Sequence, residues 1–426
     1  MNNIKYQTYI QILKEELVPA MGCTEPIALS YCASKAHDIL NKMPERCLVE
    51  VSGNIIKNVK SVVVPNTNGL KGIEAAVAAG IVAGNTNKLL EVIADVKDEE
   101  IDAINEFLKR DCIEIKPLDS EYILDIKITL FESNHYASVR IVDSHTNIIL
   151  IEKDNEILFS KENQKFNDKI VLNYDELNVA DIYEFACLVK IDDIKEVIKR
   201  QIDYNSKIAN EGIINNYGAN IGSVLLKSGN DTATKAKAMA AAGSDARMSG
   251  CELPVVINSG SGNQGITITL PIVEYAKALN VSDEKLYRAL VLANLIAIHQ
   301  KNGIGRLSAY CGAVSAGCAA GSGIAFLHGG DYQCIAHTLV NSLAITSGII
   351  CDGAKSSCAA KIAASVDAGI LGYKMYLEGQ EFKDGDGIVV KGVENTIRNV
   401  ARLGKIGMKE TDKEIIKIMM DCYLLK

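Results

Sequence analysis

The pattern of apolar positions divides the chain into segments of different character. Apolar side chains recur at helical spacing from residue 5 to residue 18, and Pro19 then favours an extended chain and predicts the end of this helix. A second helix is predicted from Thr24, its expected N-cap, to about residue 40. Beyond residue 175 helical periodicity dominates again, which predicts a nearly all-α C-terminal part.

The segment between these helical parts has the pattern of a small α/β unit. Short alternating runs predict strands at 47–55 and 59–69, and helices are expected at 70–83 and 98–109. Five further alternating runs between residues 113 and 160 are separated by turn residues and are typical of an antiparallel meander.

We therefore predict an α+β fold with two domains. A predominantly helical domain is expected from both ends of the chain, residues 1–46 plus 166–426, with an α/β domain of residues 47–165 inserted into it. The inserted domain carries the antiparallel sheet, and linkers are expected near residues 46 and 166.

Charge and composition exclude some classes of partner. The net charge of -8, without a dense Lys/Arg cluster, argues against a nucleic-acid-binding protein. The segments 253–273, 307–330 and 332–351 lack charged residues over a length that crosses a bilayer, but each is interrupted by polar residues or clustered glycines, so we expect no membrane insertion. The N-terminus lacks an apolar signal core, which favours a cytoplasmic protein. Packed Ala- and Gly-rich helices suit a homodimer.

The twelve cysteines contain one group with the features of a metal site. In SAYCGAVSAGCAAGSG and GIICDGAKSSC, the residues Cys311, Cys351 and Cys358 lie near glycine-bearing turns, where three thiolates can converge and leave one coordination position open. This favours an iron-sulfur site with Lewis-acid chemistry, against the alternative of plain buried thiols. Cys318, two helical turns after Cys311, is a competing ligand, and Cys334 has the pattern of a core residue.

A glycine-rich loop in VVINSGSGNQGITITLPIV is a candidate binding site for a small anion or amino acid. Its backbone N–H groups can approach an anion closely, and its amide side chains can orient a carboxylate or an amine. The alternatives are a tight helix–helix connection and, weakly, the substrate loop of a pyridoxal-phosphate enzyme, for which no lysine stands in an evident Schiff-base context. The candidate residues are Ser259, Gly260, Asn263 and Gln264.

Two further segments carry candidate chemistry. The turn before the second helix holds Cys23, Thr24 and Glu25 at a helix N-terminus, a position that favours a carboxylate ligand and lowers the pKa of a thiol. His299 is a candidate acid or base, although a lone histidine on an apolar helix is more often a core residue. Asn54 belongs to a turn-rich group that either forms hairpin turns or covers the site.

Several of these motifs together resemble the L-cysteine desulfidase family, relatives of the catalytic α chain of iron-sulfur-dependent L-serine dehydratase. The resemblance rests on LVPAMGCTEPIAL, SGNIIKN with VPNTNGLKG, NSGSGNQG and the three cysteines, in that order and across nearly the whole chain. It implies a 4Fe-4S cluster held by Cys311, Cys351 and Cys358, with one iron open to substrate. It also implies the pyridoxal-phosphate-independent breakdown of L-cysteine to pyruvate, ammonia and sulfide.

The chain departs from the dehydratase pattern at two places. Cys351 and Cys358 are closer together and read CDG instead of CDP, and GCTEP replaces SSHT-x-GP, with Cys23 for a serine and Thr24 for a histidine. These departures favour a desulfidase, with a serine dehydratase-type ammonia-lyase or a non-enzymatic iron-sulfur sensor as alternatives. We expect Cys23 to be the catalytic base, with His299 as the alternative. The expected substrate-binding residues are Thr24, Glu25, Asn54, Ser259, Gly260, Asn263 and Gln264.

Overall fold

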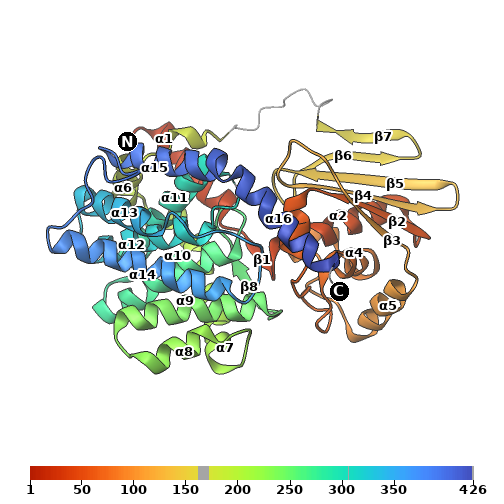
Figure 1. Cartoon of the computed structure of the whole chain (residues 1–426), viewed down its shortest axis with the longest axis horizontal. Helices are drawn as coiled ribbons and strands as arrows, with labels where there is room; N and C mark the ends of the chain where they lie inside the picture. Colours follow the sequence, from red (N-terminus) through yellow and green to blue (C-terminus); the bar gives the residue numbers. More distant parts are fainter. Residues whose placement is uncertain (162–171, 306, 425–426) are drawn as a thin grey trace.

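The predicted α+β fold is confirmed by a computed structural model, which describes residues 1–161, 172–305 and 307–424. Helices of the N- and C-terminal segments pack together on one side, and a six-stranded sheet with its own helices forms the other side (Figure 1). The described helices all fall short of the length and apolarity that a bilayer crossing requires.

The N-terminal segment follows the predicted order and adds one short strand. Helix α1 spans Asn3–Glu16 and ends before Pro19, as expected. Strand β1, Pro19–Met21, pairs antiparallel with β8, Pro254–Val256, which lies more than two hundred residues later in the chain. Helix α2, Thr24–Leu40, begins with Cys23 as its N-cap, so the prediction of Thr24 as N-cap is wrong. The β1–β8 pair sets the start of α2 beside the loop that follows β8.

The large sheet has the strand order β3-β2-β4-β5-β6-β7. Its meander consists of β4, Asp125–Glu132, β5, His135–Val142, β6, Ile148–Lys153, and β7, Glu156–Ser160, all antiparallel as predicted. Strand β3, Ile113–Pro117, instead pairs in parallel with β2, Arg46–Val51, at the other edge. The long helical connection between β2 and β3 explains this, because parallel strands require a crossover.

The helices between β2 and β3 include one that the sequence pattern does not predict. Residues 53–59 form helix α3, Gly53–Val59, where a strand is predicted up to residue 55. A short apolar run does not distinguish a strand from a buried helical turn, which explains the error. The run at 59–69 is also wrong as a strand, since only the isolated bridge between Val63 and Lys71 forms there. Helices α4, Gly72–Ala83, and α5, Asp98–Lys109, and the 3-10 turn Thr86–Glu91 complete the segment.

Helix α2 packs against β4, β5 and α4. The approach to α4 is close, because a Cβ at Gly80 would lie 2.2 Å from the carbonyl oxygen of Ser30. The predicted boundary near residue 46 assigns α2 to the helical domain, although α2 packs on the sheet of the inserted segment. The predicted boundary near residue 166 lies outside the described residues, and the division into domains stays a prediction.

The remaining chain is nearly all helical, as predicted, and β8 is the strand described in it. After the 3-10 turn Tyr174–Glu176 it contains α6 (Val179–Leu188), α7 (Ile191–Ile214), α8 (Ile221–Ser228), α9 (Thr232–Met248), α10 (Gly262–Leu279), α11 (Asp283–Ile304), α12 (Gly312–Leu327), α13 (Tyr332–Thr346), α14 (Cys358–Leu377), α15 (Val393–Arg402), the turn Leu403–Gly407 and α16 (Lys409–Leu424). Small residues let α12 and α14 meet closely: a Cβ at Gly321 would lie 2.5 Å from the carbonyl oxygen of Gly369.

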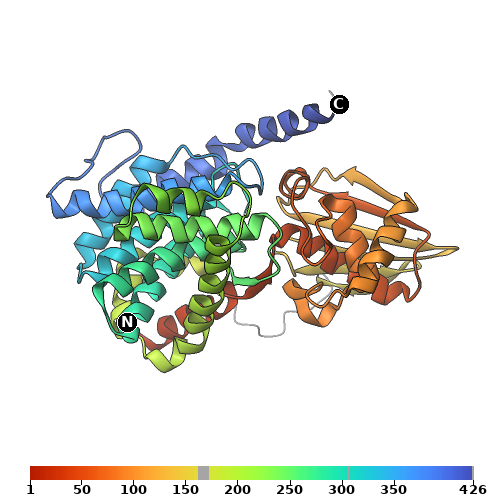
Figure 2. The ribbon, with the colours of Figure 1, turned by 90° about the horizontal axis from the view of Figure 1, so that it is seen from below.

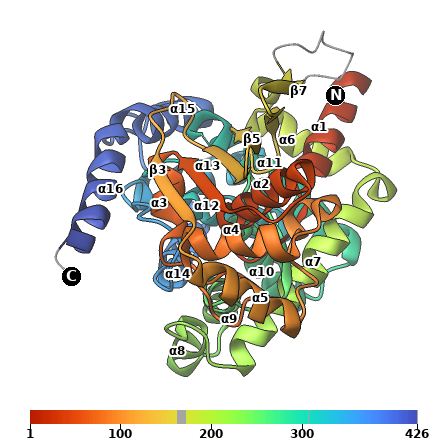
Figure 3. The same cartoon turned by 90° about the vertical axis from the view of Figure 1, so that its right-hand side faces the viewer.

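The last helix joins the two sides of the molecule. Helix α16 extends from the helical side and lies along α3, which belongs to the other side (Figures 2 and 3). A Cβ at Gly53 would lie 3.1 Å from the side chain of Ile416, so the two helices are in direct contact.

Candidate active site

One pocket brings together the predicted site residues except Asn54 and His299. It lies where the start of α2, the loop before α10, the start of α12 and the segment before α14 meet. The predicted residues that line it are Cys23, Thr24, Glu25, Ser259, Gly260, Asn263, Gln264, Cys311, Cys351 and Cys358.

The start of α2 is held against the glycine-rich loop by a hydrogen bond and a tight turn. Thr24 Oγ1 donates to the carbonyl oxygen of Gly260 at 3.0 Å. Gly22 has a φ of +59°, and a Cβ there would lie 2.2 Å from Pro65, so any other residue would be both strained and in collision. Pro65 belongs to the VPNTNG motif, and this contact gives that motif a structural role beside the pocket.

Cys23 and Glu25 form a buried pair at the N-terminus of α2. The Cys23 thiol donates to Glu25 Oε2 at 3.1 Å, and Asn58 Nδ2 donates to Oε1 at 3.1 Å. Burial and the neighbouring Glu25 charge raise the pKa of Cys23 well above its usual value, so the prediction that the helix terminus lowers this pKa is wrong. Burial also acts to raise the pKa of Glu25, but His145, the Cys23 hydrogen bond and Arg247 together lower it.

The three predicted ligand cysteines are held by short backbone contacts. Cys351 N–H donates to the carbonyl oxygen of Ala309 at 2.7 Å, and Cys311 N–H donates to that of Ile349 at 3.1 Å. These bonds form a short antiparallel link that places the start of α12 beside Cys351. Cys358 is the first residue of α14, and its thiol faces the carbonyl oxygen of Gly353 at 3.7 Å.

The charges around these cysteines favour a thiolate at Cys351. A hydrogen bond from the Cys311 thiol lowers the pKa of Cys351, and the nearby charges of Lys57 and Lys301 lower it further. The same hydrogen bond, with burial, raises the pKa of Cys311. Burial also raises the pKa of Cys358. The pocket thus pairs buried thiols with two buried lysines, which is a suitable environment for anionic metal ligands.

The three cysteines supply the donor set that an iron-sulfur cluster uses. In the described part of the chain, no three His, Cys, Asp or Glu side chains converge closely enough to hold one metal ion. Each cysteine of a 4Fe-4S cluster binds a different iron, so its ligands stand further apart than those of one ion, and all-thiolate donors are the set that such clusters use. Cys318 and Cys334 are buried in the core and do not line the pocket.

The pocket lining also includes residues that the sequence analysis did not select, among them Lys57, Asn58, His145, Arg247 and Lys301. Lys57 and Asn58 belong to the SGNIIKN motif, and a helical reading of that motif would have placed them one turn after Asn54. Arg247 and Lys301 are 3% and 4% exposed, and buried charges of this kind are rare enough to mark a site. The sequence offers only a weak signal, since each is a basic residue that follows a run of mostly small or apolar residues near the end of its helix.

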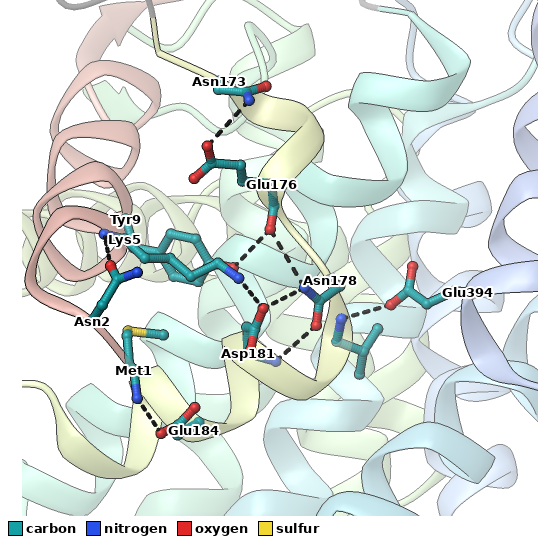
Figure 4. A network of polar contacts seen from close by, with 11 residues as sticks. Met1, Asn2, Lys5, Tyr9, Asn173, Glu176, Asn178, Asp181, Glu184 and Glu394 are labelled. Carbon is teal, nitrogen blue, oxygen red and sulfur yellow. Dashed lines mark hydrogen bonds and ion pairs between the residues drawn. The ribbon is translucent and has the colours of Figure 1, made fainter.

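Asn54 and His299 lie outside the pocket lining, each in another hydrogen bond. Asn54 Nδ2 donates to Asp412 Oδ2 at 2.9 Å. His299 Nε2 lies 2.7 Å from Glu394 Oε2. The other oxygen of Glu394 accepts from the Val179 N–H at the start of α6. Figure 4 shows Glu394 beside this segment, close to Asn178. His299 therefore belongs to a network that also ties α1 to α6 through Asp181, and its selection as a base stays a prediction.

A family model and several similar proteins match this chain over most of its length. The family model described as "Serine dehydratase alpha chain" matches residues 87–417. A UPF0597 protein of Desulfitobacterium hafniense is 62% identical, with 98% of this chain and 97% of the relative covered. UPF0597 proteins of Lachnoclostridium phytofermentans and Treponema denticola are 51% and 44% identical, over 98% and 99% of this chain and 100% and 99% of the relatives. The chain therefore belongs to the serine dehydratase alpha chain family.

Proposed function

We propose that this protein is a pyridoxal-phosphate-independent, 4Fe-4S-dependent L-cysteine desulfidase that releases pyruvate, ammonia and hydrogen sulfide. The family suggests a lyase of the iron-sulfur serine dehydratase type. The observation that carries the proposal is the single pocket in which Cys311, Cys351 and Cys358 meet the Cys23–Glu25 pair and the glycine-rich loop.

The chain supplies ligands and compensating charge at one end of the pocket. A 4Fe-4S cluster held by Cys311, Cys351 and Cys358 would supply a Lewis-acidic iron with an open position for the substrate. Lys57 and Lys301 line the same pocket, and their side chains offset the negative charge that three thiolates bring into a buried site.

The Cys23–Glu25 pair provides a route for the α-proton. The Cys23 thiol donates to Glu25 Oε2, but the raised pKa of Cys23 and the lowered pKa of Glu25 keep this proton on sulfur in the resting pocket. Cys23 therefore acts as the base once substrate binding has moved the proton to the carboxylate, which leaves a thiolate at Sγ. This thiolate takes the proton from the substrate Cα, the Cα–H electrons form the Cα–Cβ double bond, and the Cβ–S bond breaks to release hydrosulfide. The aminoacrylate product becomes an imine, and water hydrolyses it to pyruvate and ammonia.

The glycine-rich loop orients the amino-acid head group. Its backbone approaches the pocket at Ser259 and Gly260, and Asn263 and Gln264 add amide groups from the first turn of α10. Fixing the head group places Cα beside Cys23, which is how a preorganised site lowers the entropic part of the barrier.

The test measures product release from L-cysteine and from L-serine. The protein is reconstituted anaerobically with iron and sulfide and is free of pyridoxal phosphate. We expect L-cysteine to give sulfide and pyruvate in equal amounts, and faster than L-serine gives pyruvate. Faster turnover of L-serine would favour the dehydratase alternative, to which the family match lends support. A loaded protein that releases neither product would overturn the proposal in favour of a sensor.

A further inference from the structure

Arg247 places a buried guanidinium with unused hydrogen-bond donors in the pocket. It lies at the end of α9, is 3% exposed and lines the pocket beside Asn263, to whose Oδ1 its Nη1 donates at 3.1 Å. Within the described residues its Nε is buried and has no hydrogen-bond partner. A buried cation with an unpaired donor is costly unless a ligand of opposite charge completes it.

The guanidinium lies against the N-terminus of an 18-residue helix. A Cβ at Gly262, the first residue of α10, would lie 2.3 Å from Arg247 Nε, so the absence of a side chain there makes room for the guanidinium. Ser261, the N-cap of α10, makes no side-chain cap hydrogen bond. The free N–H groups and the positive end of the helix dipole therefore add to the charge of Arg247 at one spot.

The carboxylate of Glu25, which lines the same pocket, does not use these donors. Both oxygens of Glu25 accept from other groups, Cys23 and Asn58, and Glu25 interacts with Arg247 through charge. The planar guanidinium is suited to a second carboxylate from outside the chain. Asn58 adds the opposite function, since its Oδ1 is a buried acceptor without a partner in the part of the chain that the structure describes.

We propose that Arg247 and the N-terminus of α10 bind the α-carboxylate of an L-α-amino acid, whose ammonium group faces Asn58 Oδ1 and Glu25. The identification of this amino acid as the substrate rests on the proposed function. When Arg247 holds the carboxylate, the β-substituent of the substrate faces the side of the pocket that contains the three cysteines.

The test measures binding by calorimetry to the protein without a cluster, with L-alanine as a ligand that has no leaving group. Ethylamine, which lacks the carboxylate, is the matched ligand. Arg247→Met removes the guanidinium, and Arg247→Lys keeps the charge without the planar fork. Arg200→Met is the control. Among the described residues, Arg200 also has a buried Nε without a partner, and its Nη2 donates to the Leu17 carbonyl oxygen, but Arg200 does not line the pocket.

We expect wild type and Arg200→Met to bind L-alanine equally and ethylamine much more weakly. Arg247→Met should weaken L-alanine binding by about 10- to 100-fold, with Arg247→Lys in between. Equal binding of the two ligands by the wild type, no binding of either, or an unchanged affinity in both Arg247 variants would overturn the site. Carboxylate-dependent binding in a protein that releases no product would retain the site and reject only the proposed reaction.

Discussion

Lys57 Nζ donates a hydrogen bond to Asp412 Oδ1 at 2.5 Å and so joins residues 355 positions apart in the chain. The side chain of Lys57 is 1% exposed and lines the pocket, whereas Asp412 belongs to α16. Asp412 also accepts from Asn54, the residue that sequence reasoning placed in the substrate site. The C-terminal helix is thus part of the support of the pocket wall.

Removal of Asp412 is expected to destabilise the protein strongly. Asp412→Ala leaves the Lys57 ammonium buried without its carboxylate, which should cost about 3 kcal/mol in free energy of unfolding. Glu410→Ala is the control on the same helix, because Glu410 is exposed and pairs with Lys413 at the surface, and it should leave stability unchanged. Denaturant unfolding of the three proteins checks this, and equal stabilities for both variants would contradict it.

Replacement of Cys23 distinguishes loss of the catalytic base from loss of the cluster. We expect Cys23→Ser to keep the visible absorption of the reconstituted protein and to lose about 100- to 10,000-fold in turnover of L-cysteine, as for removal of a general base. Cys32→Ser is the control, because Cys32 is also buried on α2 but bonds to the Val139 carbonyl oxygen on the sheet. Full activity in Cys23→Ser would reject Cys23 as the base.

Asp245 predicts a pH dependence of stability. Its side chain is buried, Oδ2 accepts from the Gly222 N–H at the start of α8, and burial raises the pKa of Asp245 to about 6. Because an unfolded aspartate has a pKa of about 4, the folded protein binds more protons between these values, and stability falls as the pH rises from about 4 to about 6. Asp245→Asn should lack this component. Unfolding at several pH values measures the difference between the two proteins, and a difference independent of pH would show that Asp245 is not responsible.

Gly22 has a left-handed backbone conformation and a close contact with Pro65. Two variants separate the loss of stability caused by the backbone from the loss caused by the contact. Gly69→Ala introduces a Cβ at a φ of +89° with nothing within 4 Å, so it should cost about 1–2 kcal/mol from the backbone alone. Gly22→Ala adds the collision with Pro65 and should cost more, with loss of the pocket geometry. Thermal unfolding ranks the two variants. A Gly22→Ala protein as stable as Gly69→Ala would show that Pro65 moves aside freely.

Most helices and strands could be predicted from the sequence, because the patterns that indicate them are local. The meander from β4 to β7 and helices such as α5 follow from alternation, periodicity and turn residues within each segment. The parallel pairing of β3 with β2 escaped prediction because strand partners depend on a crossover that no local pattern specifies. Helix α3 escaped because its apolar run is too short to show its period.

The same distinction between local patterns and tertiary contacts explains which residues of the candidate site were predicted. The three cysteines were predicted as a group because each lies near a glycine-bearing turn. Arg247 was missed because its chemistry depends on the contact with Gly262 at the start of the next helix, which no local pattern specifies. The raised pKa of Cys23 also depends on distant packing, since Val62, Met248 and Cys358 cover its side chain. A helix terminus in the sequence gives no measure of such burial.

The ligand assignment is tested most directly by the iron and acid-labile sulfide content of serine variants after anaerobic reconstitution. We predict that Cys311→Ser, Cys351→Ser and Cys358→Ser each lose most of the iron, while Cys318→Ser and Cys334→Ser, whose thiols are buried outside the pocket, retain the wild-type content. Wild-type iron and sulfide in all three ligand variants, or loss of the cluster in Cys318→Ser alone, would contradict the assignment.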